Sequence, residues 1–203
     1  MLEWNKSLVD WFGYEKLVEF RTSLGEEYSP DNAFHQGKVA MNVDGEYRNA
    51  FIAADAPDLE YATAAFPMTD DLVDRYGSGY VTGNIIGIGK GSDNPEAAWE
   101  LIKYLTTDTD AIVELSNGLK NLPTTHEAME SPDLEVDANF QTFIDMFNHP
   151  DTTTTPASKS GAGYQQAFST WIEAWQQGGV DLEAGLVEVD KQIDDQLALV
   201  AGP

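Results

Sequence analysis

With 203 residues, 42% of them hydrophobic, the chain can build a packed core in one large domain or two small ones. A formal net charge of -24 argues against nucleic-acid partners and anionic lipid surfaces, because both require clustered lysine and arginine. The absence of cysteine excludes disulfides, thiolate catalysis and cysteine-based zinc sites.

The spacing of apolar and turn-forming residues predicts helices that alternate with short strands. In chain order we expect helical structure over residues 2–23 with Gly13 as a candidate break, a strand over 39–43, a helix over 46–52, and strands over 61–66 and 80–88. Further helices are expected to begin near Asn94, Thr109, His126, Phe140, Tyr164 and Leu182. Such alternation is typical of an α/β fold. Residues 149–158 contain four threonines and two prolines, which favour an extended linker.

Residues 33–51, AFHQGKVAMNVDGEYRNAF, are the most informative part of the sequence. A helix end closed by Gly37 precedes the predicted strand, and the turn dipeptide Asp44-Gly45 follows it. The turn places Tyr47 and Arg48 just beyond the end of that strand. Ligands of α/β folds bind at the ends of inner strands, so we predict a binding edge here.

The sequence carries no pattern for catalysis, a metal or a cofactor, and we predict none of these. The glycine-rich run at residues 83–92 fails the phosphate-loop pattern, since Asn84 stands where glycine is required and Gly91 where serine or threonine is required. The three histidines lack the mutual spacing of a zinc site, and no G-x-S-x-G motif occurs. Among 35 acidic residues some pair will meet glycosidase spacing by chance, so the count favours no enzyme.

Three tyrosines lie at the predicted edges of helices or strands, next to glycine or small residues: Tyr47, Tyr80 and Tyr164. Sugar rings have apolar faces and hydroxyl rims, so their sites combine flat aromatic rings with a few polar groups. Ordinary half-buried packing is the alternative interpretation of each tyrosine. Three tryptophans on predicted helices are instead expected in the core: Trp99, Trp171 and Trp175.

Residues 33–51 resemble the F-x-x-G-k-x-A-M-x-x-x-G-x-W signature of the extracytoplasmic sugar-binding proteins of ABC transporters, with Tyr47 in place of the usual tryptophan. Further segments continue the resemblance in the same order: residues 64–67, 79–107, 117–129 and 155–178. The order of features looks like the C-terminal half of family 1 solute-binding proteins, the group that contains the maltose-binding protein. The resemblance covers nearly the whole chain.

The resemblance implies a periplasmic-binding-protein-like fold of class II, in which two α/β lobes enclose a cleft and this chain forms the C-terminal half. Residues 1–84 would belong to the C-terminal lobe. Residues 85–150 would supply a crossing strand and helices of the N-terminal lobe, and residues 151–203 the return crossover and the last helices of the C-terminal lobe.

The resemblance also implies a function, which is to bind an oligosaccharide between the lobes and present it to a membrane permease, without catalysis. The protein would work outside the cell, as a membrane-anchored lipoprotein or in the periplasm, although this chain shows no leader. The implied ligand residues are Asp44, Tyr47, Arg48, Tyr80, Thr82, Gly83, Asn84 and Tyr164. A carbohydrate-active enzyme and a surface carbohydrate-adhesion module are the alternatives.

Family members are much longer than this chain, and their first-lobe sheet precedes the point that matches Met1. We therefore expect a fragment of such a protein. Helices that normally cover the first-lobe sheet would lack their partner, so we predict exposed apolar surface and self-association.

Overall fold

The computed structural model describes residues 2–201, and the side chains of residues 2–200. By its internal contacts the chain divides into two compact units. Unit 1 joins Met1–Leu24 with Pro156–Pro203, and unit 2 is Gly25–Thr155. None of the helices in the described residues combines the length and the apolar character that a membrane span requires.

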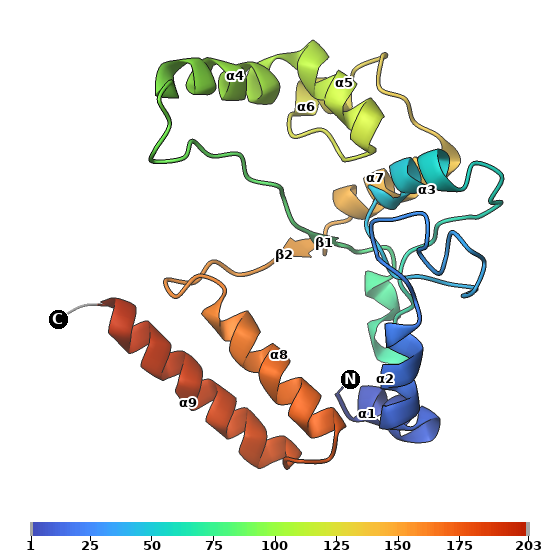
Figure 1. Cartoon of the computed structure of the whole chain (residues 1–203), viewed down its shortest axis with the longest axis vertical. Helices are drawn as coiled ribbons and strands as arrows, with labels where there is room; N and C mark the ends of the chain where they lie inside the picture. The colour runs from blue at the N-terminus through green and yellow to red at the C-terminus, as the bar shows by residue number, and fades with distance from the viewer. Residues whose placement is uncertain (1, 202–203) are drawn as a thin grey trace. The chain divides into compact units, whose positions relative to one another are not determined.

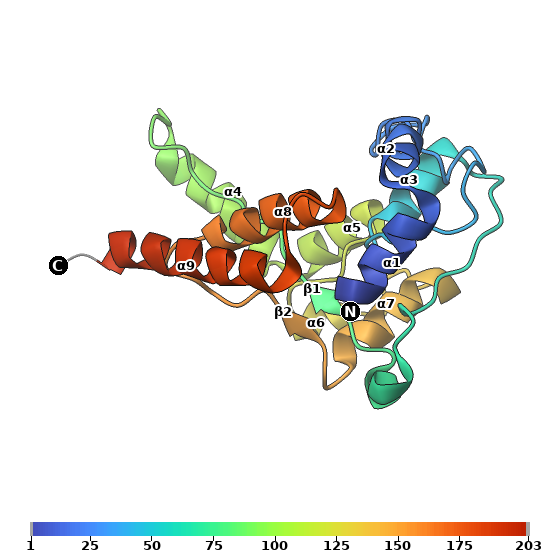
Figure 2. The ribbon, with the colours of Figure 1, turned by 90° about the horizontal axis from the view of Figure 1, so that it is seen from below.

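Unit 1 is entirely helical in its described residues. Its elements are α1 (Leu2–Phe12), α2 (Tyr14–Thr22), α8 (Gly163–Gln176) and α9 (Leu182–Ala201). The short connection between α8 and α9 turns the chain back, so the two helices lie side by side as an antiparallel hairpin (Figures 1 and 2). Gln176 of α8 donates from Nε2 to Asn5 Oδ1 of α1 at 2.7 Å, which ties α1 to this hairpin.

The core of unit 1 is built around two tryptophans of α8. Trp171 and Trp175 are 7% and 6% exposed, and their rings stack with centroids 5.7 Å apart. Val189 of α9 packs against them. A Cβ atom on Gly185 of α9 would overlap Trp171 Nε1, so a glycine is required where the ring approaches the helix. The core positions predicted for these two tryptophans are confirmed.

Unit 2 holds the remaining helices and both strands of the described chain. They are α3 (Arg48–Asp55), the 3₁₀ helix η1 (Asp70–Arg75), β1 (Tyr80–Val81), α4 (Pro95–Thr107), α5 (Thr109–Leu119), α6 (His126–Met129), α7 (Ala138–Asn148) and β2 (Thr153–Thr154). Side-chain oxygens of Asp108, Thr125 and Asp137 accept backbone N–H bonds at the starts of α5, α6 and α7. The predicted helices of this region are confirmed.

Most of the predicted sheet does not form among the described residues. β1 pairs in parallel with β2, with Tyr80 opposite Thr153 and Val81 opposite Thr154. The strands predicted at 39–43 and 61–66 are wrong for this chain, and the strand predicted at 80–88 shrinks to two residues. A strand needs a neighbour for its N–H and C=O groups, and only the threonine-rich linker segment supplies one here.

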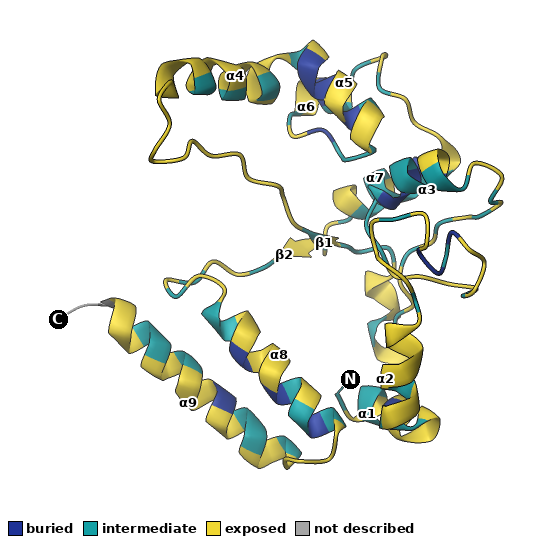
Figure 3. Cartoon of the chain, viewed as in Figure 1, coloured by how far each residue is buried: buried dark blue, intermediate teal, exposed yellow. Residues whose placement is uncertain are grey.

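Apolar side chains in these unpaired segments are open to solvent. Met41 is 87% exposed and Ile85 is 95% exposed, and the whole segment between β1 and α4 lies on the surface (Figure 3). Trp99 of α4 is 56% exposed, so its predicted core position is wrong. The predicted exposure of apolar surface is confirmed.

The compact units divide the chain differently from the lobes that the resemblance implies. Residues 25–84 make their contacts with residues 85–155, whereas the predicted lobe boundaries lie at 84/85 and 150/151. The two units are defined by contacts within this chain alone. The predicted lobes instead describe where each part of the chain would lie in a longer, two-lobe protein. The boundary between Thr155 and Pro156 does fall inside the predicted linker.

Candidate functional site

A single tight turn leads into the segment that carries the predicted site. Lys38 N–H donates to Ala33 O at 2.8 Å and Gly37 N–H donates to Phe34 O at 3.0 Å, which is a Schellman pair of bonds. Gly37 has φ +64°, the left-handed conformation that favours glycine at this position. The predicted closure by Gly37 is confirmed, although it ends an isolated turn and not a helix.

The predicted Asp44-Gly45 turn starts α3. Asp44 Oδ1 accepts from Gly45 N–H at 2.9 Å, and Gly45 O accepts from Arg48 N–H at 3.1 Å. A Cβ atom on Gly45 would lie 2.6 Å from Tyr47 Cε1, so the missing side chain lets the Tyr47 ring fold over the turn. The turn and the helix predicted after it are both confirmed.

Arg48 points into unit 2 and is only 5% exposed. Its Nε donates to Asp44 Oδ2 at 2.6 Å, and its Nη1 donates to Glu27 O at 2.8 Å. The Glu27 carboxylate lies 3.8 Å from Nη2. A buried cation is stable only where partners replace its water, and these oxygens replace part of it. In this structure the hydrogen bonds of the Arg48 side chain are therefore made within unit 2.

Three aromatic rings surround the Arg48 guanidinium. Its Cζ lies 5.3 Å from the centroid of Phe51 and 5.7 Å from those of both Tyr28 and Tyr47, within the range of cation–π attraction. Tyr28 and Tyr47 have centroids 6.2 Å apart. Tyr28 is 61% exposed and Tyr47 is half-buried, so both rings keep surface for a partner. We name Tyr28 and Tyr47 the tyrosine pair.

Tyr28 was not predicted from the sequence. It lies in a loop with no periodic pattern, 20 positions before Arg48, and this separation hides their contact in the sequence. The one available signal was a second aromatic residue shortly before the predicted binding edge.

The Tyr47 hydroxyl stays protonated at neutral pH. Burial is the main cause that raises its pKa above the ordinary value, and hydrogen bonding with Asp44 and Tyr28 raises the pKa further. Asp44 also accepts from Asn42 Nδ2 at 3.0 Å. The carboxylate of Asp44 is thus shared between the tyrosine pair and Arg48.

A buried histidine, His35, lies close enough to Arg48 to be affected by its charge. The His35 side chain is fully buried, and neither ring nitrogen has a hydrogen-bond partner among the described residues. Burial lowers the pKa of His35, the charge of Arg48 lowers it further, and the carboxylates of Asp55 and Asp44 oppose the shift. His35 is therefore held neutral, with Asp55 Oδ2 3.9 Å from Nδ1.

The remaining predicted ligand residues lie elsewhere in the chain. Tyr80 is 60% exposed and its hydroxyl bonds Thr155 Oγ1. The three residues that follow β1 are exposed, and Gly83 has open space around it: Thr82, Gly83 and Asn84. Tyr164 belongs to unit 1, where its hydroxyl donates to Pro156 O at 3.0 Å. The structure thus joins Asp44, Tyr47 and Arg48 in one network.

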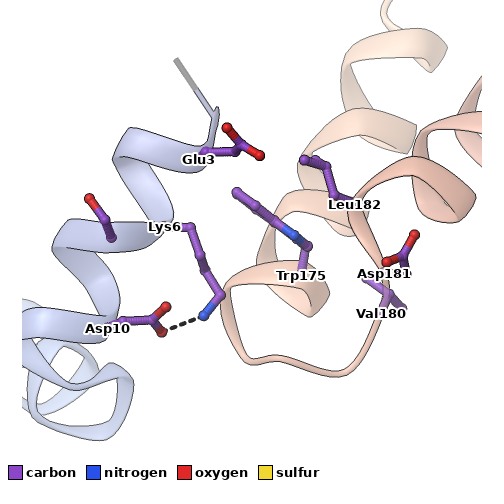
Figure 4. Close-up of a pocket in the computed structure, with 8 residues that line it drawn as sticks. Glu3, Lys6, Asp10, Trp175, Val180, Asp181 and Leu182 are labelled. Atoms are coloured by element: carbon purple, nitrogen blue, oxygen red, sulfur yellow. Dashed lines mark hydrogen bonds and ion pairs between the residues drawn. The ribbon is translucent and has the colours of Figure 1, made fainter.

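A shallow hollow in unit 1 is not a better candidate. It lies between α1 and the α8–α9 connection, where Lys6 pairs with Asp10 and Trp175 is one of the lining residues (Figure 4). Its lining shares no residue with the predicted ligand set: Glu3, Lys6, Ser7, Asp10, Trp175, Val180, Asp181 and Leu182. No group of His, Asp or Glu in the described residues has the arrangement of a metal site.

Comparison with known proteins identifies the family. The model of the family described as bacterial extracellular solute-binding protein matches residues 1–142. The chain belongs to this family. Among curated proteins, the maltotriose-binding protein of Pyrococcus abyssi (strain GE5 / Orsay) is 21% identical over 126 residues, which are 62% of this chain and 28% of that protein.

Two solved structures share the fold of this solute-binding chain. CpMnBP1 with mannotriose bound has a TM-score of 0.79 and 23% identity, and CpMnBP1 with mannobiose bound has a TM-score of 0.75 and 21% identity. Each alignment covers 95% of this chain, but only 48% and 47% of the solved chains. The chain therefore spans about half the length of the structures that it matches. The resemblance to solute-binding proteins is confirmed, and so is a fold of the periplasmic-binding-protein kind.

Proposed function

We propose that this chain is part of the substrate-binding component of a carbohydrate ABC transporter, and that its tyrosine pair forms one wall of an oligosaccharide site. The observation that carries the proposal is the tyrosine pair itself, two partly exposed rings that both contact the buried Arg48 guanidinium. Membership of the family supports the proposal. So do the relatives, since one is named a maltotriose-binding protein and the two solved structures hold mannotriose and mannobiose.

The chemistry of the tyrosine pair suits a sugar. The apolar face of a pyranose ring stacks on a flat aromatic ring, and its hydroxyl groups need polar partners at the edge. Tyr47 offers a protonated hydroxyl, with the Asp44 carboxylate beside it. As further ligand residues we propose Tyr80 of β1, the three exposed residues that follow β1, and Tyr164 of α8: Tyr80, Thr82, Gly83, Asn84 and Tyr164.

The wider role follows from the family. We assign residues 1–84 and 151–203 to the C-terminal lobe and residues 85–150 to the crossing strand and helices of the N-terminal lobe. The protein acts outside the cytoplasm, in the periplasm or anchored to the membrane, and delivers its sugar unchanged to a permease. Solute-binding proteins bind and release their ligands, so no sugar bond is expected to be broken.

Calorimetric titration with mannotriose and with maltotriose tests the proposal. Tyr47→Ala should weaken binding about 5- to 30-fold, because about 1–2 kcal/mol of stacking is lost. Tyr104→Ala is the matched control, since Tyr104 is a 52% exposed tyrosine of α4 outside the proposed site. Absence of binding to both trisaccharides, or equal effects of the two substitutions, would overturn the proposal. Release of shorter sugars would identify an enzyme.

A further inference from the structure

We propose that Arg48 is a positioning residue of this site, which holds Tyr28 and Tyr47 as one preorganised wall and never touches the sugar itself. The inference rests on the proposed function for its ligand, but the arrangement that it describes is present in the chain alone.

The position of Arg48 rules out a surface role. The side chain is 6% exposed, and hydrogen bonds from Nε and Nη1 fix its direction. Nη2 has no hydrogen-bond partner among the described residues, and the three aromatic rings enclose the same guanidinium. The guanidinium is therefore partly satisfied by ring faces instead of oxygens.

Arg48 joins two segments that are distant in sequence. Tyr47 precedes it in the chain, at the start of α3. Arg48 Nη1 donates to Glu27 O, 21 residues earlier in the chain, and Tyr28 follows Glu27 directly. Loops without regular structure move unless such contacts hold them. One side chain thus fixes the backbone beside Tyr28 and also lies against both tyrosine rings.

The geometry requires arginine and not lysine. The planar guanidinium donates to Asp44 from Nε and to Glu27 from Nη1, two acceptors that lie in different directions. A lysine ammonium is a point charge on a flexible stem and cannot reproduce this fork. An ordinary buried ion pair with Asp44 would need only the charge. Arg48→Lys therefore separates positioning from simple charge compensation.

Preorganisation has a measurable consequence for binding. A loop that is ordered before the ligand arrives loses less conformational entropy on binding, which increases affinity without any new contact. Loss of Arg48 should therefore weaken sugar binding only through the tyrosine pair. In a variant that already lacks Tyr28, the same change should have a smaller effect than in the unsubstituted chain, because only Tyr47 is left for Arg48 to position.

The test combines fluorine NMR of the chain labelled with 3-fluorotyrosine and titration with mannotriose. The variants are Arg48→Met and the milder Arg48→Lys, with Arg75→Met as matched control because Arg75 is an exposed arginine of η1. In both Arg48 variants the Tyr28 and Tyr47 resonances should shift while that of Tyr104 stays, and affinity should fall about tenfold. Arg75→Met should change neither.

The outcomes separate the two proposals. If the unsubstituted chain binds neither trisaccharide, the proposed function fails, and the fluorine spectra still decide the role of Arg48. Unchanged Tyr28 and Tyr47 resonances in folded Arg48→Lys would overturn the inference. So would a full, additive loss of affinity when Arg48→Met is combined with Tyr28→Ala, since that result indicates direct contact with the sugar.

Discussion

Each unit of the molecule carries two aromatic residues four positions apart at a helix, and the two pairs differ in burial. Trp171 and Trp175 of α8 stack with an interplanar angle of 13° and are almost completely buried. Tyr47 and Phe51 at α3 meet edge to face at 85° and remain partly exposed around a buried arginine. Equal spacing therefore says little about role: the first pair closes a core, and the second presents a surface.

The largest effect is expected at the buried pair. Trp171→Ala should lower the free energy of unfolding by about 3–5 kcal/mol, because it leaves a cavity in the core of unit 1. Trp11→Ala is the control, since that tryptophan of α1 is 83% exposed and should cost less than about 0.5 kcal/mol. Urea denaturation measures both. Equal losses would contradict the assignment of Trp171 to the core of unit 1.

A smaller effect is expected where α9 approaches that pair. Gly185→Ala places a methyl group against the Trp171 ring and should destabilise unit 1 by about 1–3 kcal/mol. Gly118 of α5 has open space around it, so Gly118→Ala should instead stabilise by about 0.5–1 kcal/mol. Thermal unfolding of the two variants should shift in opposite directions. A stabilising Gly185→Ala would contradict the close approach.

The stability of unit 2 should respond to acid through His35, which lies in the unit that carries the surface pair. The folded state lowers the pKa of His35 below the unfolded value of about 6.5, so His35 is neutral when folded. Stability is therefore highest above about pH 6.5. It falls as the pH drops below that value, because the unfolded chain then binds a proton that the folded chain does not. Denaturation followed from pH 7.5 to 5 should show unit 2 weakening.

Replacing the histidine tests this cause. His35→Gln should flatten the pH dependence of unit 2 over that range, whereas the same change at exposed His126 should leave it intact. An unchanged slope in His35→Gln would assign the acid response to other groups.

Substitution in the unpaired segment after β1 is expected to have the smallest effect on stability. It should have a clear effect on self-association. Ile85 is 95% exposed, so Ile85→Glu should change the free energy of unfolding by less than about 0.5 kcal/mol. It should reduce self-association measured by light scattering, because a charge interrupts an apolar segment able to pair with another chain. Ser92→Glu adds the same charge at an exposed polar position and should have less effect. A strictly monomeric unsubstituted chain would contradict the prediction.

Local features were predictable because their causes are local. The helix starts at Asp108, Thr125 and Asp137 depend on side chains within three residues of the bonds they accept. The Asp44-Gly45 turn and the closure by Gly37 likewise depend on adjacent backbone. The order of such segments was enough to indicate the solute-binding family.

The candidate site was predictable only in part. Asp44, Tyr47 and Arg48 share one short segment, so their common network could be expected from the sequence. Tyr28 could not, because its approach to Arg48 depends on how the loop before Gly37 folds back onto α3. The burial of Arg48 was missed for the same reason, since a charged side chain beside a turn is usually exposed.

The sequence by itself determined the helices, the turns, the family and the segment that carries Tyr47, because periodicity and capping act over a few residues. Only the tertiary structure decided which apolar residues are covered and which strands find a partner. Residues 39–43 have the composition of a strand, yet they pair with no other strand in the described chain. Trp99 has the spacing of a core residue on its helix, yet more than half of it is exposed to solvent. Burial and pairing need a second surface, and no residue specifies that surface alone.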